Sequence, residues 1–522
     1  MTFRTAAKTA SKLVALCLAL PSCAADPTDD PFLYERTAAV AAPQTFLVLY
    51  KLESLPSTFK ADIAKAGGSV IAPYPEIGVV IASASSTTFA SALAKQLLIQ
   101  AVVPTQGSAV DSLPSVTSTV KAQLAAPAQS AGEPLAGMQW NMRQIHASEA
   151  RAITPGKKSV IVGVLDSGID DSLLDLRGQV DVARSVTCIG GAADTSPENW
   201  RNDTIGHGSH VAGIIGAKEN RHGIVGIAPG VSLAAVKLTE DGFIYPEAFI
   251  CGLYWAATHN FDLVNASLFI DPYYYNCQSD PTQRAVTVAE QRVVAFAARK
   301  GVTVIAAASN EQQDLQNPTT DPFSPTNGET VPRNVDNSCK LLPVELAGVI
   351  GVSAVGASGQ LSYYSNYGLG VVDLTAPGGD LHVSAPGNAS GQIVSTVPSY
   401  SYYYQAASDW NGRVGIGCSD GLDPNAPNAD PSTCAETYAL LQGTSQATPH
   451  VTGIAALAIS RYGKLSGAQL LAKLALGTTK LACPSNPYQP YPADMEPDTC
   501  QGVKAYNSFY GAGLVDALAT IR

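Results

Sequence analysis

The sequence predicts an α/β protein in which helices flank both faces of a parallel, twisted sheet, preceded by a small α+β domain. Short apolar runs typical of strands buried on both faces recur at residues 159–165, 231–238, 263–268 and 302–307. Helical patterns lie between or beside these runs, at residues 210–217, 245–259 and 286–300. Because strands that alternate with helices build a parallel sheet, we expect a site at the strand carboxyl ends.

The first 25 residues have the order of an export signal. Arg4, Lys8 and Lys12 precede the apolar run 13–20, which small residues follow; this run is too short to span a membrane as a helix. We therefore expect the mature protein to be secreted or periplasmic. Leu-Pro-Ser-Cys, ending at Cys23, also resembles a bacterial lipobox, so a lipid anchor on Cys23 is an alternative that would attach the protein to a membrane.

Residues 26–44 form a predicted spacer before the small domain at residues 45–110. The pattern in this domain is strand, helix, strand, strand, helix, strand, at residues 46–50, 57–66, 69–72, 78–82, 87–98 and 100–103. This is the order of a split β-α-β unit. Residues 111–136 are rich in Ser, Ala, Pro and Gln, which indicates a flexible, cleavable linker. The large domain is expected at residues 137–522.

Length and charge exclude two classes of protein. With 522 residues the chain has room for one large core and a smaller domain, and 46% hydrophobic residues exclude a disordered chain. The formal net charge is −11 and long Lys/Arg runs are absent, so the sequence lacks the basic surface that nucleic acids require. We expect a monomer without a nucleic-acid partner.

Eight cysteines lie beyond the export signal, and an even number in an exported chain suggests disulfides. The pairs Cys418–Cys434 and Cys483–Cys500 are favoured because each flanks a loop rich in Asp, Pro and Asn. The sequence does not determine the connectivity. Zinc is the alternative, and the lack of a C-x-x-C spacing argues against it.

A small-residue turn with a hydroxyl, Gly443-Thr444-Ser445, runs into the apolar stretch 454–459. Pro449 is expected in the first turn of the helix, where its missing N–H costs little. Ser445 is therefore a candidate nucleophile. A serine nucleophile needs a base within hydrogen-bond reach and a third group that orients the base.

Two further segments can supply those partners. Asp166 directly follows the strand predicted at residues 159–165, although a carboxylate there could equally cap the next turn. His207 opens a helix in Gly-His-Gly-Ser-His. His207 and His210 could instead bind a metal, but no third ligand with suitable spacing is evident. We therefore expect a structural role for His210.

Together these segments resemble the subtilisin-like serine endopeptidases, the family on which the Asp, His, Ser order is itself defined. The resemblance rests on Asp-Ser-Gly-Ile-Asp, Gly-His-Gly-Ser-His-Val-Ala-Gly and Gly-Thr-Ser-x-Ala-x-Pro-His-Val-x-Gly, and it extends over residues 139–517. It implies that Ser445 attacks peptide bonds of proteins and forms an acyl-enzyme, that His207 is general base and then acid, and that Asp166 holds the imidazole. Residues 45–110 are similar to the family's ferredoxin-like, inhibitor I9-like prodomain. This implies a self-processing zymogen inhibited by its own prodomain.

The same resemblance implies further site residues. Asn310 matches the oxyanion-hole asparagine, with the Ser445 N–H as second donor, and a loop cap is the alternative. Substrate-binding positions are implied at Ser267, Leu268, Phe269, Ala308 and Ser309. Asp175 and Asn220 match ligands of the family's calcium site, so structural calcium stands beside a solvated Asp and a turn Asn as an alternative. Catalysis itself is expected to need no cofactor.

Four departures from the family pattern are present, and the first three bear on specificity more than on the reaction. Ser309 and Phe269 each replace a glycine, and Phe269 does so where the glycine lines the substrate cleft. Insertions at residues 400–404 and between Cys418 and Cys434 either reshape the cleft or pack on the surface. Gln446 replaces a methionine beside the nucleophile, which removes a thioether that peroxide oxidises.

Three hypotheses about function follow. The first is an exported serine endopeptidase made as a zymogen, which the complete set of Asp166, His207 and Ser445 favours. The second is a catalytically silent relative that binds peptides, with Phe269 blocking productive entry. The third is a lipid-anchored surface protein, which rests on Cys23 alone and is compatible with protease activity.

Overall fold

The computed structural model describes residues 43–106, 132–385, 390–406, 413–416, 436–489 and 496–522. All of them belong to one compact unit, Thr37–Arg522. The predicted export signal, Cys23, most of the linker and the pair Cys418–Cys434 lie outside the described residues. Among the described residues, no helix has the length and apolar character needed to cross a bilayer.

The N-terminal part of the described chain is a four-stranded antiparallel sheet in the order β2-β3-β1-β4. Its elements are β1 (Gln44–Tyr50), α1 (Phe59–Lys65), β2 (Ser69–Tyr74), η1 (Pro75–Ile77), β3 (Val79–Ala84), α2 (Phe89–Leu93) and β4 (Ile99–Pro104). Successive side chains of a strand point to opposite faces. In β1, Phe46 and Val48 pack with α1 and α2, whereas Leu47 and Leu49 join a second hydrophobic core. The predicted α+β fold is confirmed.

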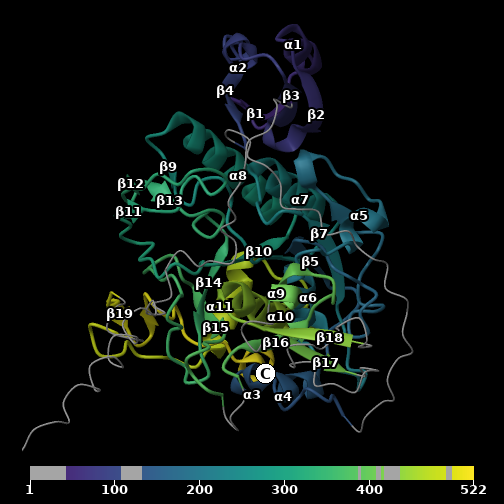
Figure 1. Cartoon of the computed structure of the whole chain (residues 1–522), viewed down its shortest axis with the longest axis vertical. Coiled ribbons are helices and arrows are strands. Elements are labelled where there is room, and N and C mark those ends of the chain that lie inside the picture. The colour runs from purple at the N-terminus through teal and green to yellow at the C-terminus, as the bar shows by residue number, and fades with distance from the viewer. Residues whose placement is uncertain (1–42, 107–131, 386–389, 407–412, 417–435, 490–495) are drawn as a thin grey trace, which may run out of the picture. The chain divides into compact units, whose positions relative to one another are not determined.

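The central sheet has seven strands in the order β15-β14-β10-β8-β5-β7-β6, and every neighbouring pair is parallel. Figure 1 labels β15, β14, β10, β5 and β7 of this sheet. The strands are β5 (Ile161–Asp166), β6 (Val186–Thr187), β7 (Ser232–Lys237), β8 (Leu263–Ala266), β10 (Thr303–Ala307), β14 (Ile350–Val355) and β15 (Leu374–Pro377). Almost all of their residues are buried, as expected for a parallel sheet covered on both faces.

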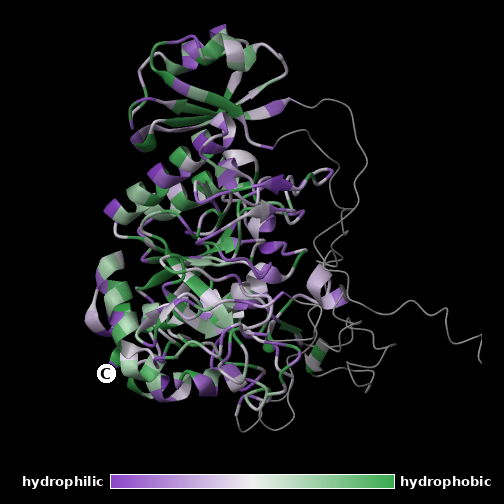
Figure 2. Cartoon of the chain, turned by 90° about the vertical axis from the view of Figure 1, so that its left-hand side faces the viewer, coloured by the Kyte–Doolittle hydropathy of each residue, from purple (hydrophilic) through white to green (hydrophobic). Residues whose placement is uncertain are grey.

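Two hydrophobic cores divide the side chains of this sheet by face. Val162 and Val164 of β5 pack in the core that contains α6 (His207–Gly216) and α10 (Thr444–Tyr462). Leu165, on the other face, packs in the core that contains α7 (Pro246–Thr258) and α8 (Pro281–Arg299). In Figure 2, hydrophobic segments lie along the strands, whereas the surface helices carry both hydrophobic and hydrophilic segments. The predicted α/β fold, with helices on both faces, is therefore confirmed.

The remaining elements are short. The helices are α3 (Trp140–Gln144), α4 (Ala147–Ile153), η2 (Ile189–Gly191), α5 (Pro197–Arg201), α9 (Tyr402–Ala406), α11 (Gly467–Gly477) and α12 (Ala517–Ile521). The strands are β9 (Asn276–Cys277), β11 (Thr320–Asp321), β12 (Arg333–Asn334), β13 (Cys339–Lys340), β16 (Ile393–Thr396), β17 (Arg413–Ile416), β18 (Glu436–Leu441), β19 (Gly502–Val503) and β20 (Tyr506–Asn507). Strand β18 pairs with both β16 and β17.

Helix α10 differs from the prediction at its start. It begins at Thr444, so Pro449 lies inside the helix and not in its first turn. A proline in a helix interior leaves the carbonyl four residues earlier without its helical donor. The Ser445 carbonyl instead accepts a hydrogen bond from Ser267 Oγ at 2.8 Å. The proline therefore frees a carbonyl that ties the candidate nucleophile to the end of β8.

Three disulfides join described residues: Cys188–Cys251, Cys277–Cys339 and Cys483–Cys500. The third was predicted. The first two were not, because each links segments more than 60 residues apart and no local loop composition marks them.

Candidate active site

The candidate site lies at the carboxyl edge of the central sheet. Leu165 of β5 and Ala306 of β10 are both register partners of Ala266 in β8, which lies between them. Asp166 ends β5, and Ser267 directly follows β8. Because parallel strands end at a common edge, chain segments far apart in sequence meet there.

Asp166 and His207 form the most direct contact of the site. His207 Nδ1 lies 2.9 Å from each carboxylate oxygen of Asp166. An ionised carboxylate only accepts hydrogen bonds, so Nδ1 carries the proton and Nε2 is left with its lone pair. Only 13% of the His207 side chain and 5% of the Asp166 side chain are exposed. The imidazole is thus held in the tautomer that a general base requires.

A second carboxylate, Asp203, supports the same histidine. It is fully buried and accepts hydrogen bonds from the hydroxyls of Ser167 and Ser209 at 2.7 Å each, and from the Gly206 N–H at 2.8 Å. Burial works to lower the pKa of His207, but the charge and hydrogen bond of Asp166 and the charge of Asp203 raise it overall. Asp203 was not predicted from the sequence, because an isolated Asp shortly before Gly-His resembles an ordinary cap.

The glycines around His207 are required by close approaches. At Gly206, φ is 89°, and a Cβ would lie 2.5 Å from Ser401 Oγ. At Gly208, a Cβ would lie 2.0 Å from the Gly168 carbonyl oxygen. A side chain at either position would displace the backbone that carries the imidazole.

Ser445 lies in the first turn of α10, a helix that packs against α6. Its Oγ donates to the Ser267 carbonyl at 3.3 Å. Within the described part of the chain no hydrogen bond joins Ser445 Oγ to His207. Proton transfer between them therefore requires the Ser445 side chain to leave the Ser267 carbonyl. Hydrogen bonds between catalytic groups are often long or poorly aligned in unliganded active sites and tighten when substrate binds.

Asn310 lies beside Ser445 with its amide orientation fixed. The Asn310 Oδ1 accepts hydrogen bonds from the Thr444 N–H at 2.8 Å and from Thr444 Oγ1 at 3.0 Å. The amide nitrogen is consequently the free end of the side chain. Among the described residues neither this Nδ2 nor the Ser445 N–H has an acceptor, so two donors are available for a developing oxyanion.

Ser309 has a backbone conformation that serine rarely adopts. Its φ is 78°. Its N–H donates to Thr444 Oγ1 at 3.0 Å, and its carbonyl accepts from the Asn366 N–H at 3.1 Å. These contacts hold the peptide in the left-handed region, where a Cβ is unfavourable. This is the physical reason why a glycine is usual at this position in the family that the sequence resembles.

The other implied substrate-binding residues differ in surroundings. Leu268 and Ala308 are buried. The Phe269 ring is only partly buried and meets the Tyr274 ring edge to face at 5.4 Å. This contact anchors Phe269 on the α7–α8 side of the sheet. Its effect on substrate entry remains a prediction.

The implied calcium ligands do not fit a cation in this arrangement. Asn220 Nδ2 donates to Asp175 Oδ1 at 2.9 Å and to the Leu174 carbonyl, while Asn220 Oδ1 accepts from the His222 N–H. The amide therefore turns its nitrogen toward Asp175, and its oxygen is used elsewhere. Calcium requires oxygen ligands that converge. Across the described ranges no group of three or more His, Cys, Asp or Glu residues is suited to holding a metal ion.

A carboxylate instead occupies the loop after Asn220. The Asn220 and Arg221 N–H groups donate to Glu133 Oε1 at 2.7 and 2.6 Å, and the Gly223 N–H donates to Glu133 Oε2 at 3.1 Å. Three converging N–H groups make a site for an anion. The buried Asp175 has a pKa raised to about 6, chiefly by desolvation.

His210 and His450 are buried neutral histidines. His210 Nε2 lies 3.2 Å from the carbonyl oxygens of Ile393 and Ala439 and must donate to them. Burial lowers the pKa of His210 to about 3 and that of His450 to about 4. The structural role predicted for His210 agrees with these contacts.

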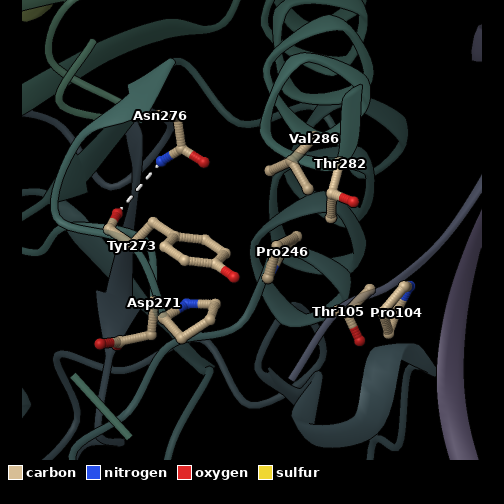
Figure 3. A pocket seen from close by; sticks show the side chains of 9 residues that line it. Pro104, Thr105, Pro246, Asp271, Tyr273, Asn276, Thr282 and Val286 are labelled. Carbon is tan, nitrogen blue, oxygen red and sulfur yellow. Dashed lines mark hydrogen bonds between the residues drawn. The ribbon is translucent and has the colours of Figure 1, made fainter. Parts of the chain in front are cut away.

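A separate pocket lies where the end of β4 and Thr105 meet the loop 271–276 and helices α7 and α8. Figure 3 shows Asp271 and Tyr273 on one side of it and Thr282 and Val286 of α8 on the other. Asn276 Nδ2 donates to the Tyr273 carbonyl at 3.1 Å. None of Asp166, His207 and Ser445 lines this pocket, so it is distinct from the candidate active site.

Comparison with known proteins identifies the family. Residues 157–513, more than half of the chain, match the subtilase family, peptidase S8. The chain belongs to the subtilase family. Subtilases are serine endopeptidases that hydrolyse peptide bonds without a cofactor for catalysis, and this subtilase has their parallel sheet with flanking helices.

Sequence relatives and solved structures agree with this assignment. This subtilase is 29% identical over 324 residues to subtilisin DY from Bacillus licheniformis, covering 62% of this chain and 85% of that protein. It is 30% identical over 325 residues to subtilisin NAT from Bacillus subtilis subsp. natto, covering 62% of this chain and 61% of that protein. The structure of the epidermin leader peptide processing serine protease from Staphylococcus aureus superposes with a TM-score of 0.64 at 19% identity, covering 92% of this chain and 98% of that one. The last comparison concerns the fold alone.

Proposed function

We propose that Asp166, His207 and Ser445 form the catalytic triad of this subtilase. The observation that carries the proposal is the pairing of His207 Nδ1 with both oxygens of Asp166 at 2.9 Å. It lies at the sheet edge where Ser445 contacts Ser267. A histidine held in this way offers its Nε2 lone pair to a serine hydroxyl.

The proposed reaction proceeds by acyl transfer. The Ser445 Oγ proton passes to His207 Nε2 as Oγ attacks the peptide carbonyl carbon. The Ser445 N–H and Asn310 Nδ2 donate to the resulting oxyanion. Collapse breaks the C–N bond, and His207 gives its proton to the leaving amine. Water then attacks the acyl carbon while His207 takes its proton. The bond between that carbon and Ser445 Oγ breaks, Oγ receives the proton from His207, and the carboxylic acid product leaves.

A fluorophosphonate probe tests this proposal because it forms an adduct with an activated serine. We expect the adduct to map to Ser445 in the processed protein and to be lost in His207→Ala. The His210→Gln variant is the control, since His210 bonds to carbonyls inside the core. A correctly processed chain that the probe does not label would instead be a catalytically silent, peptide-binding relative.

We also propose that residues 45–110 act as an intramolecular inhibitor, removed by cleavage in residues 111–136. Several contacts to the large domain support this role. The Arg292 guanidinium of α8 donates to the Tyr50 and Ile77 carbonyls at 2.8 and 3.2 Å. Gln106 Nε2 donates to Glu247 Oε1 at 2.8 Å. The Gln106 contact holds the segment from which the chain continues toward the linker.

The substrates proposed for the mature enzyme are proteins or peptides outside the cytoplasm. The basic and apolar N-terminus supports export, and the disulfides among the described residues suit an oxidising compartment. A lipid anchor on Cys23 is the alternative location. Mass spectrometry of the mature N-terminus distinguishes them: cleavage beyond residue 110 releases the enzyme from any lipid carried by Cys23.

A further inference from the structure

A short insertion lies directly against the chain segment that carries His207. Backbone N–H groups of Tyr402 and Tyr403, at the start of α9, donate to the Thr204 and Ile205 carbonyls at 2.8 and 3.0 Å. The insertion is therefore hydrogen-bonded to the residues immediately before the imidazole.

Two more contacts fix the insertion on the same segment. Ser401 fills the space above Gly206, where a Cβ would lie 2.5 Å from Ser401 Oγ. The Tyr400 hydroxyl donates to Asp170 Oδ2 at 3.2 Å, and the Asp170 N–H donates to Ser209 Oγ at 3.0 Å. Residues on both sides of His207 therefore contact the insertion, either directly or through Asp170.

The side chain that reaches the imidazole is Tyr403. The ring centroids of Tyr403 and His207 are 5.7 Å apart, with an angle of 37° between the ring planes. Tyr403 is partly exposed, whereas Tyr404, next to it, is buried in a small core with Val397 and Ala439. The buried neighbour anchors α9, and the ring of the partly exposed Tyr403 stands beside His207.

We propose, on the basis of the triad proposed above, that Tyr403 is a positioning residue whose ring orients His207 and stabilises the imidazolium formed during the reaction. An aromatic ring attracts a cation that lies over its face within about 6 Å of the ring centroid. His207 becomes such a cation when it takes the Ser445 proton. The ring gains little from the neutral imidazole, so its effect is selective for the charged state.

Other ionisable groups also lie around His207. Asp166 approaches from β5 and Asp203 from the loop before α6, and both favour the imidazolium. His210, in α6, is neutral because of its burial and carries no competing charge. Tyr400 lies next to Asp170 and Asp203, and burial together with these carboxylates raises its pKa, so it stays uncharged. Tyr403 is the neighbour from α9.

The pH dependence of kcat/KM distinguishes this role from a structural one. Without the ring the imidazolium is less stable, so the pKa of His207 falls. In Tyr403→Leu the acidic limb of the profile should move down by about half a pH unit, and kcat on the plateau should fall about three- to tenfold with KM nearly unchanged. Tyr403→Phe keeps the ring face and should behave like the wild type. Tyr402→Leu, which removes the adjacent ring that meets Tyr403 edge to face at 5.9 Å, is the matched control.

An unmoved acidic limb in active Tyr403→Leu overturns the inference, as does a Tyr402→Leu variant that shifts the limb equally. A loss of kcat with no shift of the limb assigns Tyr403 a structural role only. Failure of the wild type to react with a fluorophosphonate at Ser445 contradicts the triad itself, and so separates failure of the proposed function from failure of this inference. Circular dichroism of each variant confirms that it is folded.

Discussion

At the scale of single residues, the site combines a hydrogen-bonded pair of side chains with a nearby residue whose backbone conformation is strained. Asp166 and His207 hold each other at 2.9 Å, whereas Ser309 has a φ of 78° beside Asn310. A left-handed conformation costs a residue with a Cβ roughly 1–2 kcal/mol. This cost is borne next to a predicted oxyanion donor, where the hydrogen bonds of Ser309 to Thr444 and Asn366 impose the conformation.

The strain at Ser309 gives the first prediction. Ser309→Gly should raise the free energy of unfolding by about 1 kcal/mol, because glycine adopts this φ without the Cβ penalty. Urea denaturation in a Ser445→Ala background, which prevents self-digestion, measures the change. Ser309→Ala retains a Cβ and serves as the control, with no gain expected. Equal stability of the glycine and alanine variants would contradict the strain.

At the scale of secondary-structure elements, α8 contains a carboxylate that the fold does not satisfy. Glu290 is fully buried, and neither of its side-chain oxygens has a hydrogen-bond partner among the described residues. Burial alone raises the pKa of Glu290 well above its ordinary value. The folded protein therefore holds a proton on Glu290 at pH values where the unfolded chain has released it.

Glu290 predicts how stability changes with pH. Since the folded pKa is the higher one, its contribution is fully present below the unfolded pKa, about 4.3, and is lost as pH rises toward the folded pKa, by up to about 1.4 kcal/mol per pH unit. Glu290→Gln removes this dependence. Its stability relative to the wild type should grow from pH 5 to pH 7 in urea denaturation, again in a Ser445→Ala background. Glu149→Gln, at an exposed glutamate of α4, should leave the slope unchanged.

The loop after α6 leads to a prediction about metal removal. Glu133 accepts hydrogen bonds from three backbone N–H groups there, and the Asn220 amide donates a hydrogen bond to Asp175. A chelator should therefore leave the melting temperature unchanged. Glu133→Gln should lower stability by about 1–2 kcal/mol, because hydrogen bonds to a charged acceptor are replaced. A melting temperature that falls with EDTA and recovers with calcium would show that the loop rearranges around the ion.

The elements also show what local sequence can predict. Strands β5, β7, β8 and β10 were found because each contains an apolar run. Strand β6 is too short to give a pattern, and in β14 the polar Ser353 interrupts the apolar run. The start of α10 was misplaced because Pro449 is tolerated where Ser267 satisfies the freed carbonyl, a contact between distant segments.

In the candidate site, too, residues in local motifs were predicted, whereas contacts between distant segments were not. Asp166, His207, Ser445 and Asn310 lie in local motifs and were predicted from them. Asp203 and Glu133 were not predicted, and the insertion at residues 400–404 was predicted without the contact of Tyr403 to His207. These surroundings arise only when distant segments meet. Glu133 contacts the loop at residues 220–223, and Tyr403 contacts the segment before His207. No spacing within one motif indicates such partners.

At the scale of the whole molecule, the small antiparallel sheet has both faces buried. One face packs on α1 and α2, and residues such as Leu47 and Leu49 on the other face join the core that contains α7 and α8. Two cations of α8 reach the small sheet. Arg292 donates to the Tyr50 and Ile77 carbonyls and to Gln100 Oε1, whereas Arg299 pairs with Glu53 at 3.4 Å, where both side chains are about half exposed.

These two arginines give a matched test of the proposed prodomain. Arg292→Ala leaves carbonyl groups of the small sheet without a charged donor, a loss of roughly 1.5–3 kcal/mol, so the cleaved prodomain should dissociate about 10- to 100-fold faster. Arg299→Ala removes only an exposed ion pair, worth at most about 1 kcal/mol, and should behave nearly like the wild type. The measurement is the lag before peptidase activity appears after self-cleavage of the full chain. The lag should shorten in Arg292→Ala and not in Arg299→Ala, because release of the inhibitor limits the appearance of activity. Equal lags in both variants would mean that the contacts of α8 do not control release of the prodomain.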